Sequence, residues 1–305
     1  MKRFVYKYLL FVLPLLLIFF FLEYSLRNIK SGYTTKLDGL IAKSNAIEIL
    51  IVGNSHANYG IDPAYLSLPA YNMAYVSQTI LYDKQIILKY LPILKNLKYV
   101  IISIDYPTLY YGSDETRDFF YYHYYGINLR HKSYFNQNLS YFFYVFSPVP
   151  SIKLLLNKAG DLFVNGDSFV NGWQGYDSTN YTYINEKAGK QKAEHFDDEI
   201  NSSNEHRYIC SEFESLIALL KQKNITPVLV SAPCYKYVTD NLDNNRMDEN
   251  LLFVKKLQAQ YNLAYLNSLE DTSFKIEDFY DCDHLNKFGA EKFTMKINNL
   301  INSLH

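Results

Sequence analysis

Cysteine, tryptophan and net charge are all scarce in this chain. Its 305 residues include 3 cysteines and 1 tryptophan, and the formal net charge at pH 7 is -1. So few cysteines cannot build a disulfide-rich scaffold, and the sequence has neither the Cys-x-x-Cys nor the His-x-x-x-His spacing of a structural zinc site. A nearly balanced charge argues against a nucleic-acid binder, which normally carries a basic excess. We therefore expect no metal, no cofactor and no nucleic-acid partner.

Tyrosine, by contrast, is abundant, with 30 residues beside 20 phenylalanines. Aromatic faces are suited to stacking on sugar rings, so this excess is compatible with a surface that handles glycans. A general bias of the sequence toward Tyr, Asn and Lys is the alternative explanation. The chain is long enough for one large domain with a proper core, or for one domain that carries an insertion.

The start of the chain contains an apolar run from Phe4 to Leu22, in which Lys7 is the only charged residue. That length is about what a helix needs to cross a bilayer. No Ala-x-Ala cleavage site follows the run, so we predict an uncleaved anchor at residues 1–25 rather than a signal peptide. Lys2 and Arg3 favour a cytoplasmic N-terminus, although basic residues beyond the run weaken this orientation. The prediction places the rest of the chain outside the cytoplasm, in the periplasm or on the cell surface.

One short stretch combines a strand with a candidate nucleophile. The apolar run Ile49–Val52 is typical of a strand buried in a parallel sheet, and Gly53 ends it before the turn Asn54-Ser55-His56. Ligands of open α/β sheets bind just beyond the carboxyl ends of the strands. Ser55 therefore lies where a nucleophile would act, unless this turn is an ordinary connection between a strand and a helix.

A motif near the other end of the chain supplies what such a serine needs. A serine hydroxyl requires a base to take its proton, and the base requires a third group to fix its tautomer. Asp281-x-x-His284, at the start of an expected helix, offers both groups from one turn. We therefore assign Ser55 as nucleophile, His284 as general base and Asp281 as the carboxylate that orients it.

Together these motifs make the sequence resemble the SGNH/GDSL hydrolase superfamily, over about residues 45–108 and 205–305. The resemblance rests on Gly53-Asn54-Ser55-His56 and on Asp281-x-x-His284-Leu285-Asn286, followed by Gly289 and Ala290. It implies an SGNH-type three-layer α/β sandwich around a parallel sheet of about five strands. It also implies acyl transfer through an acyl-Ser55 intermediate.

The resemblance further implies an oxyanion hole. The second conserved block of the family has an Asn-x-Gly-x-x-Gly-like pattern, and its match here is Asn72-x-Ala74-x-x-Ser77. Ser77 stands where the family has the glycine whose backbone N–H binds the oxyanion, and it is also a candidate N-cap of the following helix. The N–H groups of Ser55 and Ser77 are the implied donors, and the motif residues Asn54 and Asn72 are further candidates for oxyanion or substrate binding.

Asp105 departs from the family pattern. The family has Gly-x-Asn-Asp at the end of the third strand, where the Asn side chain donates a third hydrogen bond to the oxyanion, but this chain has Ser103-Ile104-Asp105-Tyr106. An ionised carboxylate accepts hydrogen bonds and cannot donate them. Asp105 is therefore turned away from the oxyanion, or it binds a substrate hydroxyl, or it orients His56.

Alternating strand and helix patterns predict the rest of the fold. Apolar runs indicate buried strands, and amphipathic spacing indicates helices between them. The expected strands are residues 49–52, 71–74, 98–106, 225–232 and 263–266, and the expected helices are residues 75–95, 205–224, 247–261 and 286–304. Helices should then cover both faces of a parallel sheet.

The predicted organisation is an anchor at residues 1–25, a linker at 26–46 and one α/β domain at 47–305. Residues 107–204 are an insertion after the third strand and are crowded with aromatic residues. Because it would overhang the carboxyl edge of the sheet, we interpret the insertion as a lid or acceptor-binding subdomain, with a local core as the alternative. Residues 165–203, rich in Asn, Gly, Ser and Asp, are predicted to be irregular.

These features favour a membrane-anchored serine esterase or O-acyltransferase that acts on a cell-envelope glycan. Its partners would be an acyl donor, a glycan acceptor and the membrane, with a multi-span acyl-exporting membrane protein as a further candidate. A non-catalytic glycan-binding or scaffold subunit of an envelope polysaccharide complex is the main alternative, and a lipase-like hydrolase is a third. The sequence also leaves open a disulfide between Cys234 and Cys282, which would pin the His284 loop.

Overall fold

The computed structural model describes residues 2–27, 30–112, 115–131, 169–201 and 204–304. The chain divides into two compact units, Met1–Thr34 with Glu115–Ser168 and Thr35–Asp114 with Phe169–His305. The second unit contains the sheet and every residue to which a catalytic or binding role was assigned above.

A five-stranded parallel sheet forms the centre of this second unit. Its spatial order is β2-β1-β3-β4-β5, and every neighbouring pair is parallel. The strands are β1 (Ile49–Val52), β2 (Ala70–Asn72), β3 (Tyr99–Ser103), β4 (Thr226–Ser231) and β5 (Ala264–Asn267). All residues of β1 and β3 are buried, which explains why both strands are continuous apolar runs rather than alternating ones.

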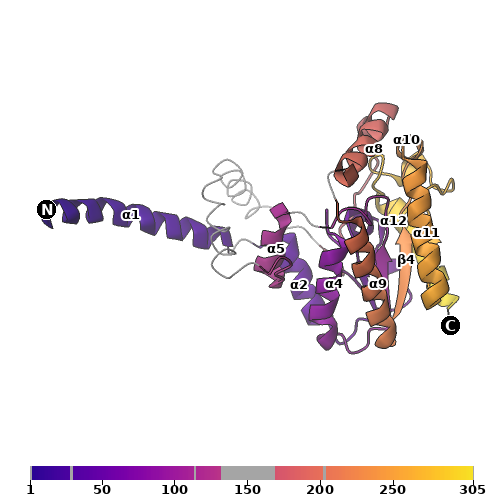
Figure 1. The fold of residues 1–305 in the computed structure, drawn as a ribbon, viewed down its shortest axis with the longest axis horizontal. Helices are drawn as coiled ribbons and strands as arrows, with labels where there is room; N and C mark the ends of the chain where they lie inside the picture. The colour runs from indigo at the N-terminus through magenta and orange to yellow at the C-terminus, as the bar shows by residue number, and fades with distance from the viewer. Residues whose placement is uncertain (1, 28–29, 113–114, 132–168, 202–203, 305) are drawn as a thin grey trace. The chain divides into compact units, whose positions relative to one another are not determined.

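Helices cover both faces of the sheet. On one side, α9 packs against β4 and lies between α4 and α11 (Figure 1). Elsewhere in the unit, α12 packs against α3 and β5, and α8 packs against α10. The helices of this unit are α3 (Ser55–Gly60), α4 (Ile80–Tyr90), α8 (Glu186–Asn201), α9 (His206–Gln222), α10 (Lys236–Thr239), α11 (Asn244–Tyr261) and α12 (Lys287–Asn302). Short 3-10 turns lie at Pro63–Tyr65, Leu91–Ile93, Tyr181–Tyr183 and Ile276–Asp278. The three-layer α/β fold predicted from the sequence is confirmed.

The strand order creates one preferred position for a binding site. From β1 the chain goes to β2 on one side and then returns to β3 on the other side, so that β1 lies between them. The register pairs Ile51 with Asn72 of β2 and with Ile101 of β3. Open α/β sheets bind ligands at such a switch point, outside the carboxyl ends of the two diverging strands. Ser55 follows β1 at that edge.

Gly53 is required by the closeness of β1 and β3 at this edge. Its φ is +137°, a conformation that residues with a side chain rarely adopt. A Cβ at this position would lie 2.5 Å from Cβ of Ser103 and 3.2 Å from Cβ of Ala57. Glycine therefore lets the chain leave β1 sharply and begin α3 at Ser55.

The other unit contains α1 (Lys2–Arg27) and α5 (Glu115–Tyr125). A segment of 19 residues in α1, Arg3–Phe21, is apolar and long enough to cross a bilayer. Tyr33 contributes to a separate aromatic cluster, because its ring contacts rings of α5 at centroid distances of 5.4–5.8 Å, namely Phe120, Tyr121, Tyr124 and Tyr125.

Helix α2 (Gly32–Lys43) lies within the predicted linker. The structure differs from the sequence prediction in the insertion. Residues 165–203 are not irregular throughout, because they contain α8, whose buried residues recur every three or four positions, at Gly189, Ala193, Phe196 and Ile200. That spacing is a helical face, but the surrounding polar residues concealed it. The predicted aromatic run Tyr141–Phe146 lies outside the described residues.

Candidate active site

The structure brings the three predicted catalytic side chains into one line of hydrogen bonds. Oγ of Ser55 lies 2.9 Å from Nε2 of His284. The other ring nitrogen, Nδ1, lies 3.0 and 3.1 Å from the two carboxylate oxygens of Asp281. These contacts join residues 229 positions apart in the chain. The arrangement is the one that a general base needs in order to take a proton from a serine hydroxyl.

The loop that carries Asp281 and His284 is fixed by its own backbone and by the helix that follows it. Oδ1 of Asp281 accepts hydrogen bonds from the backbone N–H groups of Asp283 and His284. The side chain of Asn286 caps α12 by accepting from Phe288 and Gly289, and its amide donates to the carbonyl of Glu277. The motif Asp-x-x-His-Leu-Asn thus contains the predicted catalytic pair, Asp281 and His284, and the helix cap that anchors it.

The nucleophile lies in the first turn of α3. Asn54 is the N-cap of this helix, and its side chain accepts from the N–H of His56 at 2.9 Å. This cap places the backbone N–H of Ser55 at the exposed start of a helix, where no intrahelical acceptor exists. Asn54 also lines the cavity in front of Ser55.

Ser77 has the backbone conformation expected of the glycine that it replaces. Its φ is +54°, in the left-handed region. Ser55 and Ser77 line the same cavity, and within the part of the chain that the structure describes neither backbone N–H has a protein acceptor. Two unpaired donors at one cavity are a suitable oxyanion hole. Ser77 is not the N-cap of α4, because that position belongs to Thr79.

Asn72, a candidate for oxyanion or substrate binding, lies in the core instead. Its side chain is fully buried, donates to the carbonyls of Ala57 and Ile61, and accepts from the N–H of Ala74. These bonds use both of its N–H donors and an oxygen lone pair inside the core. The structure therefore assigns Asn72 to holding α3 and the Ser77 turn together, and it corrects the expectation of a substrate contact.

Asp105 is also buried away from substrate, and it orients His56. Its side chain accepts from the hydroxyl of Ser103 at 2.6 Å and from the N–H of Ala232 at 3.4 Å. Its Oδ2 lies 3.2 Å from Nδ1 of His56. This contact has an ion-pair distance without the angle of a hydrogen bond. Of the three roles considered for Asp105, the structure selects the orientation of His56 and corrects the assignment to oxyanion or substrate binding.

His56 lies between two buried carboxylates. Its Nε2 is 3.3 Å from Oδ2 of Asp283, on the side opposite Asp105. Burial alone would lower the pKa of His56, but Asp105 and Asp283 outweigh it and raise that pKa to about 10. Despite their burial, the cations around them hold the pKa values of both carboxyl groups below the usual range. His56 is therefore an imidazolium at neutral pH, not a second base.

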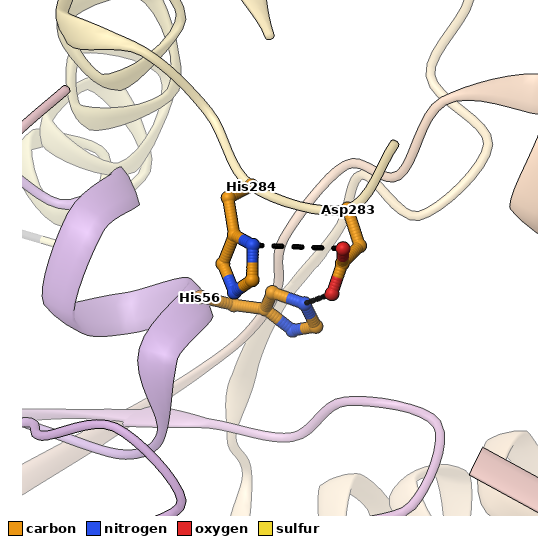
Figure 2. A group of neighbouring side chains, drawn as sticks. All are labelled: His56, Asp283 and His284. Atoms are coloured by element: carbon orange, nitrogen blue, oxygen red, sulfur yellow. Dashed lines mark hydrogen bonds and ion pairs between the residues drawn. The ribbon is translucent and has the colours of Figure 1, made fainter. Parts of the chain in front are cut away.

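The cluster His56, Asp283 and His284 has the spacing of a metal site but not the chemistry (Figure 2). One donor atom from each residue lies within 4.8 Å of the others. A protonated imidazole has no lone pair to offer a cation, and His56 is protonated in this environment. The geometry therefore fits an ion-pair network rather than a cation-binding site.

Helix α8 contributes one wall of the cavity at Ser55. The cavity has a volume of about 110 Å³. It is lined mainly by polar side chains, and α8 supplies Lys192, His195, Phe196 and Glu199. Nζ of Lys192 lies 2.8 Å from Oδ2 of Asp283. A helix that the sequence did not predict therefore faces the predicted nucleophile.

Aromatic rings stand beside the catalytic histidine. The rings of Tyr176 and Tyr280 stack at 3.6 Å, and Tyr59 lies 4.4 Å from Tyr176 and 5.5 Å from His284, measured between ring centroids. Burial and the neighbouring hydroxyl of Tyr59 raise the pKa of Tyr176 far above its ordinary value. These tyrosines were counted in the composition, but no sequence spacing linked them to the site.

Lys36 supports the site, although the sequence analysis did not single it out. Its side chain is fully buried, and Nζ donates to Oδ1 of Asn58 at 2.6 Å and to the carbonyl of Ala74. Lys36 thereby joins α2 to α3 and to the turn that leads to Ser77. Burial without a carboxylate partner lowers its pKa well below the usual value.

The disulfide left open by the sequence is absent, since Cys210, Cys234 and Cys282 all lie in the described residues and are all free thiols. Cys282 donates instead to the carbonyl of Tyr183 at 3.1 Å. Burial raises the pKa of Cys234 well above its ordinary value, so this thiol is not a reactive nucleophile.

Comparison with known proteins adds a distant likeness in fold. A scan against models of protein families and a search of curated proteins gave no match. Among solved structures, the chain is similar to a protein from Bacteroides fragilis NCTC 9343 that is provisionally named an acylhydrolase (BF3764). The match covers 91% of this chain and 100% of that chain, with 8% sequence identity and a TM-score of 0.43.

Proposed function

We propose that the chain is a serine esterase or O-acyltransferase that works through an acyl-Ser55 intermediate. The observation that carries the proposal is the line of contacts from Ser55 through His284 to Asp281. His284 takes the hydroxyl proton as the oxygen attacks the ester carbonyl, and the N–H groups of Ser55 and Ser77 bind the developing oxyanion. His284 then returns the proton to the leaving alcohol, and water or a second alcohol releases the acyl group.

The size of the cavity favours a short acyl group. Sites for drug-sized ligands usually have volumes of roughly 300–1,000 Å³, whereas the cavity at Ser55 has about 110 Å³ and a largely polar lining. This argues against the lipase-like alternative. Full-length protein in detergent should therefore hydrolyse an acetyl ester of 4-nitrophenol at least about ten times more efficiently than the dodecanoyl ester, and a preference for the long chain would restore the lipase alternative.

The proposal includes a membrane anchor and a glycan acceptor. Helix α1 has the length and apolarity of a membrane span, so the catalytic unit would work at the membrane surface, outside the cytoplasm. The tyrosines beside His284 offer aromatic surface next to the proposed general base, and such surface suits a sugar ring. The acyl donor and a multi-span partner that exports it remain part of this proposal.

Labelling with a fluorophosphonate tests the nucleophile directly. We expect the full-length protein to be labelled in detergent and Ser55→Ala to lose at least about 10⁴-fold in labelling rate, because a triad acts as a unit. Ser303→Ala removes an exposed hydroxyl at the end of α12 and should label like the wild type. Folded protein that resists labelling would instead indicate the non-catalytic glycan-binding subunit. The feature that favoured that alternative, Asp105 in place of the family's Asn, is accounted for by its contact with His56.

A further inference from the structure

His284 has two carboxylates near its ring, whereas a catalytic triad has only one. Besides Asp281, its Nδ1 lies 3.5 Å from Oδ1 of Asp283. A second carboxylate at this distance stabilises the protonated imidazole. A carboxylate charge that is not offset favours the protonated form of a neighbouring imidazole, and a protonated imidazole cannot take the proton of Ser55.

Two cations already engage this second carboxylate. Oδ2 of Asp283 lies 2.8 Å from Nζ of Lys192 and 3.3 Å from Nε2 of His56. Dashed lines in Figure 2 join Asp283 to both imidazoles, and its two oxygens are seen to face different rings. Asp283 is 4% exposed, so solvent screens these interactions little.

We propose that Lys192 and His56 are positioning residues that offset the charge of Asp283 and thereby set the pH range in which His284 can take the proton of Ser55. The inference rests on the proposed function and adds two residues from different helices to it, one from α8 and one from α3. Neither side chain hydrogen-bonds to Ser55 or His284. Lys192 acts through Asp283, and His56 acts through Asp283 and also directly, because its ring lies 5.3 Å from that of His284 between centroids.

The other groups around His284 do not replace this role. Helix α3 presents the ring of Tyr59, and the segment before α8 presents Tyr176, at centroid distances of 5.5 and 6.4 Å. On α8, His195 is paired with Glu199 at 3.4 Å. At the ends of β3 and β4 lie Asp105, which is paired with His56, and the thiol of Cys234.

The charged side chains around His284 add up to a net charge that the proton from Ser55 would neutralise. Asp105, Asp281 and Asp283 carry three negative charges, and His56 and Lys192 carry two positive ones, which leaves one negative charge while His284 is neutral. The proton that His284 accepts from Ser55 neutralises that charge. Removing Lys192 leaves a further negative charge beside His284, which therefore binds its proton more tightly in the free enzyme.

The test compares Lys192→Met with two matched controls. Lys192→Arg keeps the charge, and Lys190→Met removes an equal charge from the exposed side of the same helix, where Lys190 lies 4.0 Å from Glu194. The rate of fluorophosphonate labelling of full-length protein in detergent is measured from pH 5 to 9. We expect the acid limb for Lys192→Met to move to higher pH by about one unit. The acid limb for Lys192→Arg should keep its wild-type position, and the whole profile of Lys190→Met should match that of the wild type.

Asp283→Asn should move the acid limb the opposite way, to lower pH by about one unit, because the second carboxylate is gone. Profiles for Lys192→Met that superimpose on the wild type would overturn the inference and leave the proposed function intact. If the wild type is not labelled, the proposed function fails, and titration of ¹⁵N-labelled histidine, with His284→Gln to identify the signal, still decides the inference. An unshifted His284 signal in Lys192→Met would then reject it.

Discussion

Two buried basic side chains, His56 and Lys36, hold helix α3 in place. His56 has charged partners, whereas the partners of Lys36 are uncharged. His56 lies between the carboxylates of Asp105 and Asp283. Lys36, from α2, donates only to uncharged oxygens. Both side chains are almost completely buried, yet the pKa of His56 is raised to about 10 by its two carboxylates, against the effect of burial, and burial alone lowers that of Lys36. The charge of the partners, and not the degree of burial, decides whether the pKa of a buried base is raised or lowered.

The two bases also support different halves of the candidate site. His56 is tied to Asp283, the residue next to His284, and so it supports the loop of the general base. Lys36 is tied to the carbonyl of Ala74, three residues before Ser77, and so it supports the oxyanion side. Ion pairs therefore stabilise the side of the site that carries His284, and hydrogen bonds to uncharged oxygens stabilise the side that carries Ser77.

The largest expected difference is in stability. His56→Gln leaves two buried carboxylates without the cation between them and should lower the free energy of unfolding by about 3–5 kcal/mol. Lys36→Met removes a donor from two buried acceptors but also relieves the burial of an amine, so we expect a smaller loss of about 1–3 kcal/mol. Chemical denaturation of the full chain in detergent measures both changes.

His195→Gln is the matched control for the charged half, because His195 lies on the exposed edge of α8 and its side chain is 61% exposed. Its stability should stay within about 0.5 kcal/mol of the wild type. If His56→Gln is as stable as this control, the ion pairs of His56 do not stabilise the site.

The oxyanion half should respond most at Ser77. Ser77→Pro removes the backbone N–H and imposes a φ near -65° where the structure has +54°. We expect a loss of about 10²–10³-fold in kcat. Ser77→Gly keeps the N–H and suits this φ, so its kcat should equal that of the wild type. Circular dichroism checks the fold, and a folded proline variant with wild-type kcat would remove Ser77 from the oxyanion hole.

The smallest effect is a pair of opposite pH dependences. The pKa of His56 is raised on folding, so its stabilisation is fully present below about pH 6.5 and is lost as the pH rises toward 10, by up to about 1.4 kcal/mol per unit. The pKa of Lys36 is lowered on folding, so its penalty diminishes as the pH rises toward about 10.4. Between pH 7 and 9.5, the stability of the wild type should fall relative to His56→Gln and rise relative to Lys36→Met. Parallel trends would contradict the opposite directions of the two pKa shifts.

The sequence was sufficient for the sheet and for proposing that Ser55, Asp281 and His284 come together. The buried runs of β1 and β3 are apolar on both faces, and the motifs around Ser55 and His284 have recognisable spacing, so both residues could be placed at one edge. It was insufficient for the network around them. Lys192 comes from a helix with a mostly polar sequence, and its contact with Asp283 depends on how α8 lies over the sheet, which no local pattern encodes.

The role of Asp105 could not be decided from the sequence either. Its type departs from the family pattern, and the sequence left three roles open. Only the position of His56, fixed by the cap of α3 and by Asp283, shows that this carboxylate has a cationic partner. Roles that depend on a neighbour from another segment, as for Asp105 and Asn72, could be decided only from the packed structure.

The separation of Ser55 from His284 by 229 positions affects when the protein can act. A ribosome releases the nucleophile, its helix and the oxyanion turn early, but the base emerges only just before α12. Under the proposed function, a growing chain stays inactive until residue 284 has left the ribosome. The serine gains its proton acceptor only once the His284 loop has been made and α12 has docked against α3.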